Sequence, residues 1–228
     1  MGIVIETPLG NVVHTGDFKI DHTPVDSNPT DLGVLSKLGE QGVLLLLSDS
    51  TYAEVPGYTP SEKIVGETLE KVIGESSGRV IVATFASLIA RVQQILDAAV
   101  KYKRKVSFVG KSMKDNVKLG LREGYLQAPN DLIVSTEEIR HLAPSEAVIV
   151  TTGSQGEPTS GLTRIAKNEH KELTIIEGDT VVISATPIPG NETVVSKNIN
   201  NLLKLGAKVL HDKIALVHVH GHASQEEL

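Results

Sequence analysis

The chain has 228 residues, of which 40% are hydrophobic and 22% charged, and it contains no cysteine. These totals exclude a disulfide scaffold and are typical of one or two globular domains that bury a real core. The net charge of −6 repels polyanions, so nucleic-acid binding would need a local basic patch or bound cations.

Membrane and secretion signals are missing from the sequence. It has no charged-then-apolar signal pattern at its start, and no apolar run approaches the roughly 18 residues that span a bilayer. We therefore expect a soluble cytoplasmic protein that makes no membrane contact. Aromatic residues make up 3% of the chain and tryptophan is absent, which leaves few platforms for stacking single-stranded bases.

The first part of the chain predicts mixed α and β structure. Residues 2–18 have the pattern of two strands around a Leu9-Gly10-Asn11 turn. Residues 25–41 form a polar, proline-containing connection, and residues 42–51 then predict an apolar strand. A helix is expected to begin at Thr59, followed by proline at the first helical position and a glutamate that can complete a capping box.

From residue 79 onward, short β-branched runs alternate with helical stretches. A helix is predicted at 88–102, and strands are predicted at 79–85, 105–109, 131–135, 147–153 and 180–185. Near-continuous apolar strands separated by helices indicate a parallel sheet covered on both faces, and so an α/β fold. A last strand is predicted at 213–221, with no helix after it.

Polar residues gather just after the apolar runs, where ligands bind in open α/β sheets. Asp17, Asp49 and Ser87 occupy such positions, as do the segments 153–157 and 186–192. We therefore expect some of these side chains to share a site.

Ser87 ends a strand and opens a helix, so its hydroxyl and the first free amides can hold a phosphate, with Arg91 one turn further along. On composition alone, a simple helix cap is the favoured alternative. The 153–157 loop has two glycines suited to an anion but lacks the lysine and spacing of a P-loop. The basic run 101–105 can be an RNA-facing patch or, more often in proteins, a solvated helix end.

His218, His220 and His222 alternate, so they share one face if the segment is extended. That geometry can chelate a metal. Alternation is also common in half-buried strands, and no cysteine or carboxylate cluster lies near in sequence to complete a zinc site. One functional histidine is therefore a better hypothesis than three ligands.

The ordered motifs HTGDFKID, LLSDST, PGYTPSE, TFAS, FVGKSM, TTGSQGEP, IPGNE and HVHGHASQEEL together resemble the bacterial ribonuclease J proteins of the metallo-β-lactamase/β-CASP superfamily. The resemblance runs essentially the full length. It implies a parallel-sheet β-CASP domain with helices on both faces, flanked by partial metallo-β-lactamase strands. Residues 1–58 would end the first lactamase half, 59–210 would form the β-CASP domain, and 211–228 would begin the second half.

The resemblance also implies roles for single residues. Asp17 matches the aspartate that bridges two zinc ions, since its two oxygens can each bind a cation. Asp49 and His222 match a catalytic pair, in which a carboxylate holds the imidazole protonated so that it can protonate the leaving oxygen.

A pocket for the 5′-phosphate of RNA is implied by Ser87 together with the segment that holds Gly221, Ala223 and Ser224. His220 stands where many relatives carry serine, so a phosphate or solvent contact is as good a hypothesis as none.

The implied function is part of a zinc-dependent ribonuclease that cleaves RNA, preferably 5′-monophosphorylated, as an exonuclease or endonuclease. The full-length parent would be a homodimer. The family's HxHxDH metal motif does not occur in this sequence, so we expect the isolated chain to be an inactive segment. The alternatives are a stand-alone phosphate- or nucleotide-binding module and a relative that acts on DNA or a small phosphoester.

Overall fold

The computed structural model describes residues 2–228, which form two units. One unit contains the residues up to Lys63 together with Val219–Leu228, and the other is Ile64–His218. These divisions lie a few residues beyond the expected domain boundaries at 58 and 210. Within the described residues, no helix is long and apolar enough to cross a membrane.

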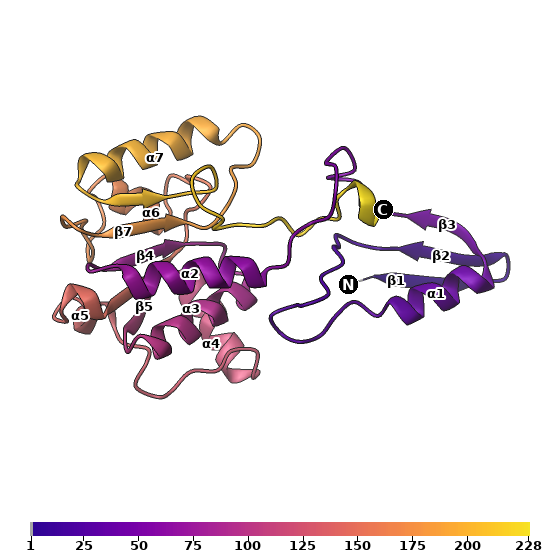
Figure 1. The fold of residues 1–228 in the computed structure, drawn as a ribbon, viewed down its shortest axis with the longest axis horizontal. Coiled ribbons are helices and arrows are strands. Elements are labelled where there is room, and N and C mark those ends of the chain that lie inside the picture. The colour runs from indigo at the N-terminus through magenta and orange to yellow at the C-terminus, as the bar shows by residue number, and fades with distance from the viewer. Residues whose placement is uncertain (1) are drawn as a thin grey trace. The chain divides into compact units, whose positions relative to one another are not determined.

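The Ile64–His218 unit is built on a five-stranded, all-parallel sheet (Figure 1). The strand order is β5-β6-β4-β7-β8. The strands are β4 (Val80–Ala83), β5 (Lys105–Val109), β6 (Ala147–Thr151), β7 (Thr180–Ile183) and β8 (Lys208–Leu210). Every residue of β4, β6 and β7 is buried, which explains their continuous apolar sequences.

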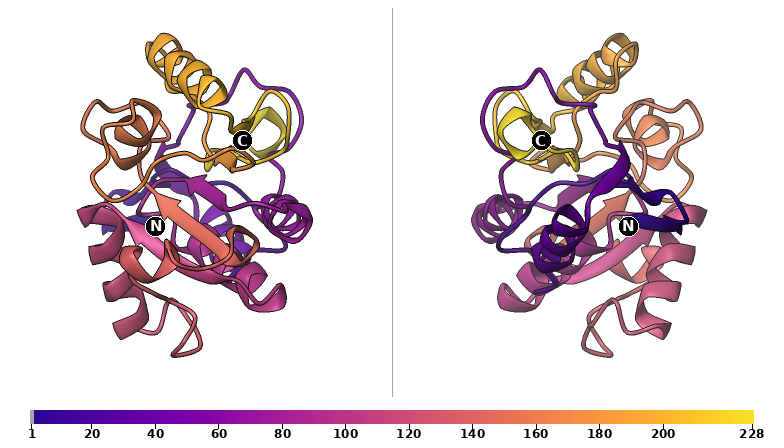
Figure 2. Two further views of the ribbon diagram at one scale, coloured as in Figure 1. Left: turned by 90° about the vertical axis from the view of Figure 1, so that its left-hand side faces the viewer. Right: turned by 90° about the vertical axis from the view of Figure 1, so that its right-hand side faces the viewer.

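Helices cover both faces of this sheet (Figure 2). The helices are α2 (Lys63–Glu75), α3 (Ile89–Lys101), α4 (Lys111–Arg122), α5 (Thr136–Ile139), α6 (Gly161–Ala166) and α7 (Glu192–Lys204), with a 3-10 turn at Pro144–Glu146. One core cluster joins strand residues such as Ile81 and Ile149 to Ile139, Leu162 and Leu202 of α5, α6 and α7. The expected α/β fold with a covered parallel sheet is confirmed.

A buried ion pair fastens the start of β4 to the turn before β7. The guanidinium of Arg79 donates two hydrogen bonds to the carboxylate of Asp179, at 2.9 and 2.6 Å, and a third to the carbonyl of Thr174. The side chain of Asp179 is fully buried and also accepts from the amide of Ile176. The pair is thus satisfied on both sides, as buried charges must be.

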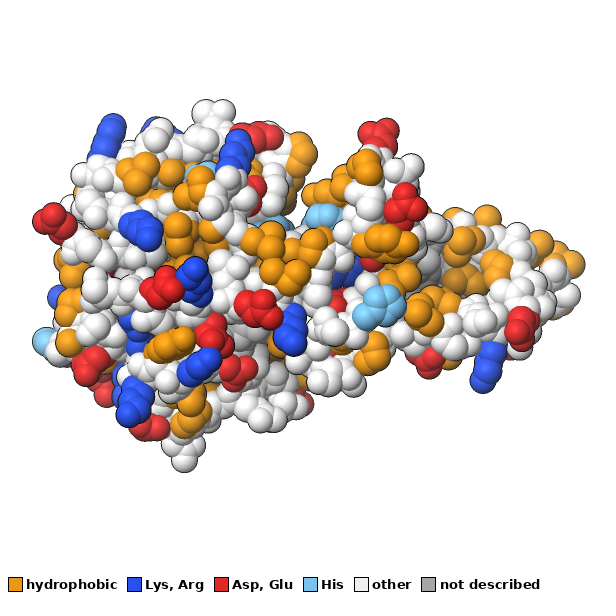
Figure 3. Space-filling view, in the orientation of Figure 1, with side chains coloured by type: hydrophobic (Ala, Val, Ile, Leu, Met, Phe, Trp, Pro, Cys, Tyr) orange, Lys and Arg blue, Asp and Glu red, His pale blue; other side chains and the backbone are white. Residues whose placement is uncertain are grey.

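The smaller unit has a three-stranded sheet of β1 (Ile3–Thr7), β2 (Gly10–His14) and β3 (Val43–Leu47), in that order, with α1 (Leu32–Gln41) before β3. β2 pairs antiparallel with β1 and parallel with β3. All residues of β1 and β3 are exposed, and hydrophobic side chains cover much of the surface over these elements (Figure 3). A 3-10 turn at Gln225–Glu227 belongs to the same unit.

Five sequence predictions were wrong in detail. The polar connection at 25–41 contains α1, whose first turn Asp31 caps by accepting from the amide of Val34. The turn between β1 and β2 lies at Pro8 and Leu9, because Gly10 already pairs with Thr7.

The predicted strand at 131–135 is a single bridge from Ile133 to Val106, because Ser135 immediately starts the capping box of α5. The segment 213–221 forms no strand, and the outer edge of the sheet is β8 instead.

The helix expected at Thr59 begins at Lys63. The hydroxyl of Ser61 accepts from the amide of Lys63, the first residue of α2, and the carboxylate of Asp21 holds this turn by accepting from the Ser61 hydroxyl and the Glu62 amide. Thr59 is left for contacts with the end of the chain.

Candidate active site

Asp17, Asp49 and His222 meet in one cluster. Each offers one metal-ligating atom, and these three atoms all lie within 4.8 Å of one another. Asp17 follows β2 and Asp49 follows β3, and these two strands run parallel, so their carboxyl ends share one edge of the sheet. His222 arrives from the other end of the chain, 173 residues after Asp49.

Asp49 is the buried member of the cluster, with a side chain only 4% exposed. Burial raises its pKa, but hydrogen bonds outweigh burial and hold the pKa far below the usual range. The donors are the amide and hydroxyl of Thr51, the ring of His222 and the amide of Phe18. Asp49 is therefore an ionised carboxylate at neutral pH.

The ionised carboxylate of Asp49 determines which ring nitrogen of His222 carries a proton. Nδ1 of His222 lies 2.8 Å from Oδ2 of Asp49. A carboxylate can only accept, so Nδ1 must carry the proton of this bond. The imidazole is thus oriented by Asp49, which leaves Nε2 for chemistry.

A stack of rings holds the segment on which His222 lies. The ring of Tyr52 stacks on His220 with centroids 3.8 Å apart and planes 6° apart, and lies 5.7 Å from the ring of His222. Burial lowers the pKa of His220, so its ring is predominantly neutral at pH 7. Nδ1 of His220 is buried and has no hydrogen-bond partner among residues 2–228.

Glu227 ties three segments of this unit together. Its carboxylate accepts from the amides of Ile20 at 3.0 Å, Thr59 at 2.7 Å and Ser224 at 2.9 Å. The hydroxyl of Thr59 donates to the carbonyl of His222 and lies 2.9 Å from the hydroxyl of Ser224. Glu227 was not among the predicted site residues, although a serine followed three residues later by glutamate is the signal of a capping box.

The predicted phosphate-binding residues have different surroundings. Gly221 is exposed, whereas Ala223 is 2% and Ser224 1% exposed, and the hydroxyl and amide of Ser224 already have internal partners. Ser87 belongs to the Ile64–His218 unit, where it is exposed just before α3. It does not cap α3, since the cap position is Leu88 and no side chain caps there.

Arg91 does not add surface charge beside Ser87, contrary to expectation. Its side chain is fully buried, and Nη1 donates to the carbonyl of Ser184 at 2.9 Å and lies 3.0 Å from Nδ1 of His218. A guanidinium only donates, so Nδ1 of His218 must accept. His218 is thus a hydrogen-bond partner of the buried Arg91 in the larger unit. Among the described residues, the metal-type cluster is formed by Asp17, Asp49 and His222, without His218 or His220.

The basic run 101–105 is not an open RNA-facing patch. Lys101 pairs with Glu70, and Lys105 pairs with Asp131. Arg104 is 4% exposed and donates to the carbonyls of Ser76 and Gly78, just after α2. The expected alternative, charges that serve a helix end, describes this run better.

Comparison with known proteins decides the family. The family model described as "Ribonuclease J, beta-CASP domain" matches residues 77–202. The chain belongs to the ribonuclease J family. It is 50% identical over 225 residues to "Ribonuclease J" of Synechocystis sp., covering 99% of this chain and 35% of that protein.

Two further relatives of the ribonuclease J family agree. "Ribonuclease J" of Thermus thermophilus is 49% identical, covering all of this chain and 39% of the relative. "Ribonuclease J2" of Bacillus subtilis is 46% identical, covering all of this chain and 41% of the relative. The chain thus spans about two fifths of the length of these proteins. The resemblance stated from the motifs is confirmed, as is the presence of a β-CASP domain.

Proposed function

We propose that this chain supplies part of the active centre of a ribonuclease that hydrolyses RNA phosphodiesters in RNA processing and decay. The observation that carries the proposal is the pairing of Asp49 with His222 within 4.8 Å of Asp17. These residues come from the two ends of the chain and form one polar cluster. Membership of the ribonuclease J family supports RNA as the substrate class.

His222 is the proposed general acid. Asp49 accepts the Nδ1 proton of the imidazole and so fixes the ring with Nε2 turned away from the carboxylate. A protonated Nε2 can then donate a proton to the oxygen that leaves when the phosphodiester is cleaved. Such a contribution is typically about 10²–10⁴-fold in rate.

Asp17 is the proposed zinc ligand. Carboxylate oxygens and imidazole nitrogens are zinc donors, so the cluster has the right chemistry for a divalent cation, and the carboxylate of Asp17 is exposed beside it. When bound, such ions supply a Lewis acid that stabilises negative charge on phosphoryl oxygens. A catalytic zinc ordinarily has about three protein ligands, so we propose that further ligands lie in parts of such a protein outside these 228 residues.

The proposed substrate is RNA with a 5′-monophosphate. The exposed backbone of Gly221 and the exposed hydroxyl of Ser87 are the predicted contacts that remain open to a phosphate in the structure of each unit. Ser224 is buried and engaged with Thr59 and Glu227, so its proposed contribution is to hold the segment in place. A homodimer of the longer protein is part of the same proposal.

The experiment uses a chimera in which this chain replaces the matching 227 residues of the Thermus thermophilus relative. We expect the chimera to cleave 5′-monophosphorylated RNA, and His222→Ala to lower kcat by about 10²–10⁴ with little change in KM. The matched control is His141→Ala, at an exposed histidine of the larger unit, which should cleave normally. An unchanged kcat in the His222 variant would rule out the proposed acid.

A second measurement tests the metal. The 228-residue chain alone is expected to show no zinc-dependent RNA cleavage. Asp17→Asn in the chimera should lower its affinity for zinc, measured by metal competition with a chelating dye. Zinc affinity equal to that of the parent chimera would exclude Asp17 as a ligand.

A further inference from the structure

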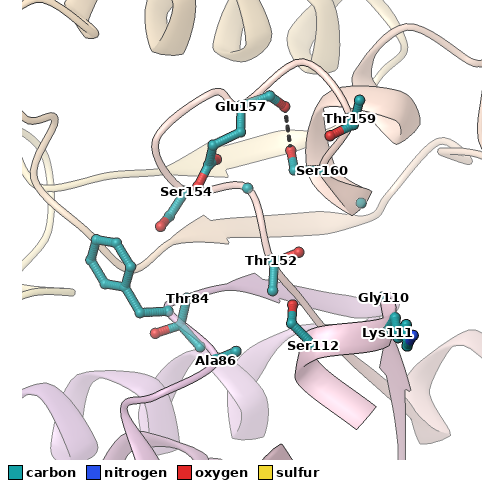
Figure 4. A pocket seen from close by; sticks show the side chains of 13 residues that line it. Thr84, Ala86, Gly110, Lys111, Ser112, Thr152, Ser154, Glu157, Thr159 and Ser160 are labelled. Atoms are coloured by element: carbon teal, nitrogen blue, oxygen red, sulfur yellow. Dashed lines mark hydrogen bonds between the residues drawn. The ribbon is translucent and has the colours of Figure 1, made fainter. Parts of the chain in front are cut away.

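A hollow of about 550 Å³ lies in the Ile64–His218 unit, at the carboxyl ends of three neighbouring strands (Figure 4). Its wall is made by the loops after β4, β5 and β6. These loops supply Thr84 to Ala86, Gly110 to Ser112, and most of the stretch from Thr152 to Gly161. Neither Ser87 nor Arg91 lines it, so it is separate from the contacts considered above.

The topology of the sheet makes this position special. From β4 the chain crosses through α3 to β5, toward one edge, whereas from β6 it crosses through α6 to β7, toward the other. β4 and β6 are neighbours, so their loops leave in opposite directions and open a crevice between them. Ligands of open α/β sheets bind at such a switch point.

Hydroxyl groups dominate the lining. Ser112, Thr152, Ser154 and Ser160 surround the hollow in Figure 4, with Glu157 and Ser160 on one side and Lys111 and Ser112 on the other. The hydroxyls of Ser112, Thr152 and Ser154 can donate to phosphate oxygens without adding negative charge. That of Ser160 already donates to the carbonyl of Glu157. The carboxylate of Glu157 is the acidic group in this lining.

Two observations point to a polar ligand in the hollow. Helix α4 opens into the hollow after Gly110, and no side chain caps it, so its first amides and its positive dipole end face that space. Independently, Thr84 lines the same hollow with a fully buried side chain, and its hydroxyl has no hydrogen-bond partner within residues 2–228. Native proteins seldom leave such a group unpaired.

Lys111 supplies to this hollow the cation that the 153–157 loop lacks. That loop has the glycines of an anion-binding turn but no cation of its own. Because β5 and β6 are paired in parallel, Lys111 after β5 comes to the same hollow as Gly153 after β6. The loops after β5 and β6 thus bring together a lysine and an anion-binding turn, which neither loop has alone.

We propose that this hollow binds the phosphate group of a nucleotide, with the phosphate at Lys111 and the start of α4. Glu157 on the opposite side then accepts from hydroxyl or amino groups of the attached nucleoside. The site goes beyond the proposed catalytic function, since it lies within one unit and needs neither metal nor hydrolysis. Its ligand has two sources with the same chemistry, a free mononucleotide or an internal phosphate of an RNA strand.

The test is isothermal titration calorimetry on the 228-residue chain with adenosine 5′-monophosphate, adenosine and the dinucleotide ApA. We expect adenosine 5′-monophosphate to bind at least about tenfold more tightly than adenosine. Tighter binding of the monophosphate than of ApA identifies a terminal phosphate as the ligand, and equal binding identifies an internal one. Equal affinity for adenosine and its monophosphate would refute the proposal.

Variants locate the site. Lys111→Gln should weaken monophosphate binding about tenfold or more, whereas Lys114→Gln, one turn further along α4 and outside the hollow, should not. Ser112→Glu puts a negative charge where the phosphate lies, so monophosphate binding should be lost. Because an acid in the first turn stabilises a helix, the midpoint of thermal unfolding should not fall. Equal effects of the Lys111 and Lys114 substitutions on monophosphate binding would overturn the assignment.

Discussion

Glu227 is expected to control the geometry of the candidate active site without belonging to it. Its carboxylate accepts amide hydrogen bonds from Ile20, Thr59 and Ser224, and these residues belong to three separate stretches of the chain. Ile20 follows the Asp17 loop, and Ser224 follows His222. Glu227→Ala leaves all three amides without their acceptor, so the three stretches lose their common anchor.

The size of the effect follows from the bonds that are lost. A hydrogen bond to a charged group contributes about 1.5–3 kcal/mol when well buried, and Glu227 is partly exposed, so solvent replaces part of this. We expect Glu227→Ala to cost about 2–4 kcal/mol in the stability of this unit. Glu227→Gln keeps one acceptor oxygen, so it should cost about half as much.

Native-state hydrogen exchange measures this directly. In Glu227→Ala, the amides of Ile20, Thr59 and Ser224 should exchange about thirtyfold or more faster than in the parent chain. Glu226→Ala is the matched control, because that neighbouring side chain is exposed and makes none of these bonds. Equal exchange rates in the two variants would refute the reasoning.

The stability that Glu227 contributes also depends on pH. Burial raises the pKa of Glu227, but the hydrogen bonds from Ser224, Thr59 and Ile20 outweigh it and lower the pKa below its ordinary value of 4.5. A carboxylate with a lowered pKa stabilises the fold above that ordinary value, and the contribution is lost as pH falls through the folded-state pKa. The difference between parent and Glu227→Ala should therefore be full at pH 7 and shrink steadily below pH 4.5.

Two further predictions concern the other anchors. Asp179→Ala should lower the free energy of unfolding by about 3–5 kcal/mol, because Arg79 stays buried without its partner. The measurement is urea unfolding followed by circular dichroism. Asp131→Ala, which removes an exposed ion pair, is the control, and an equal loss in the two variants would contradict the prediction. Tyr52→Ala should raise the pKa of His220 toward 6.5 in an NMR titration, since water reaches the ring, whereas Tyr52→Phe keeps the stack and the lowered value; one titration midpoint for all three proteins would exclude the shielding role.

The central fold could be predicted because its signal is local. β4, β6 and β7 are buried on both faces, so their apolar runs are continuous and their type is unambiguous. Helix α1 was missed because the polar, proline-containing stretch before it obscured a short apolar stripe, Leu32, Leu35 and Leu38, at helical spacing. Its glycines, Gly33 and Gly39, further weaken the helical pattern.

The predicted strand at 213–221 failed for a different reason. Its alternation is real, since Val217 and Val219 are buried while Leu216 is 45% exposed. The burial is not accompanied by strand pairing, since the carbonyl of Val217 accepts from the hydroxyl of Ser184. Alternation therefore reports which side of a segment is covered, and it does not report whether the backbone belongs to a sheet.

The candidate site shows a similar division between motif and geometry. Asp17, Asp49 and His222 could be chosen from their motifs, and the structure brings them together. Arg91 could not be placed, because whether a cation after a strand faces solvent or the core depends on tertiary neighbours such as Ser184 and His218.

The orientation of His222 therefore depends on residues that never touch the reacting atoms. Asp49 sets the tautomer, Tyr52 stacks beside the ring of His220, and Glu227 anchors the segment that follows. Because these contacts hold the ring of His222 and the segment around it, their loss should lower kcat of the chimera more than KM, as expected when a catalytic group is misplaced and binding is kept. A scan limited to residues near the substrate would miss Glu227, whose removal shifts three stretches at once.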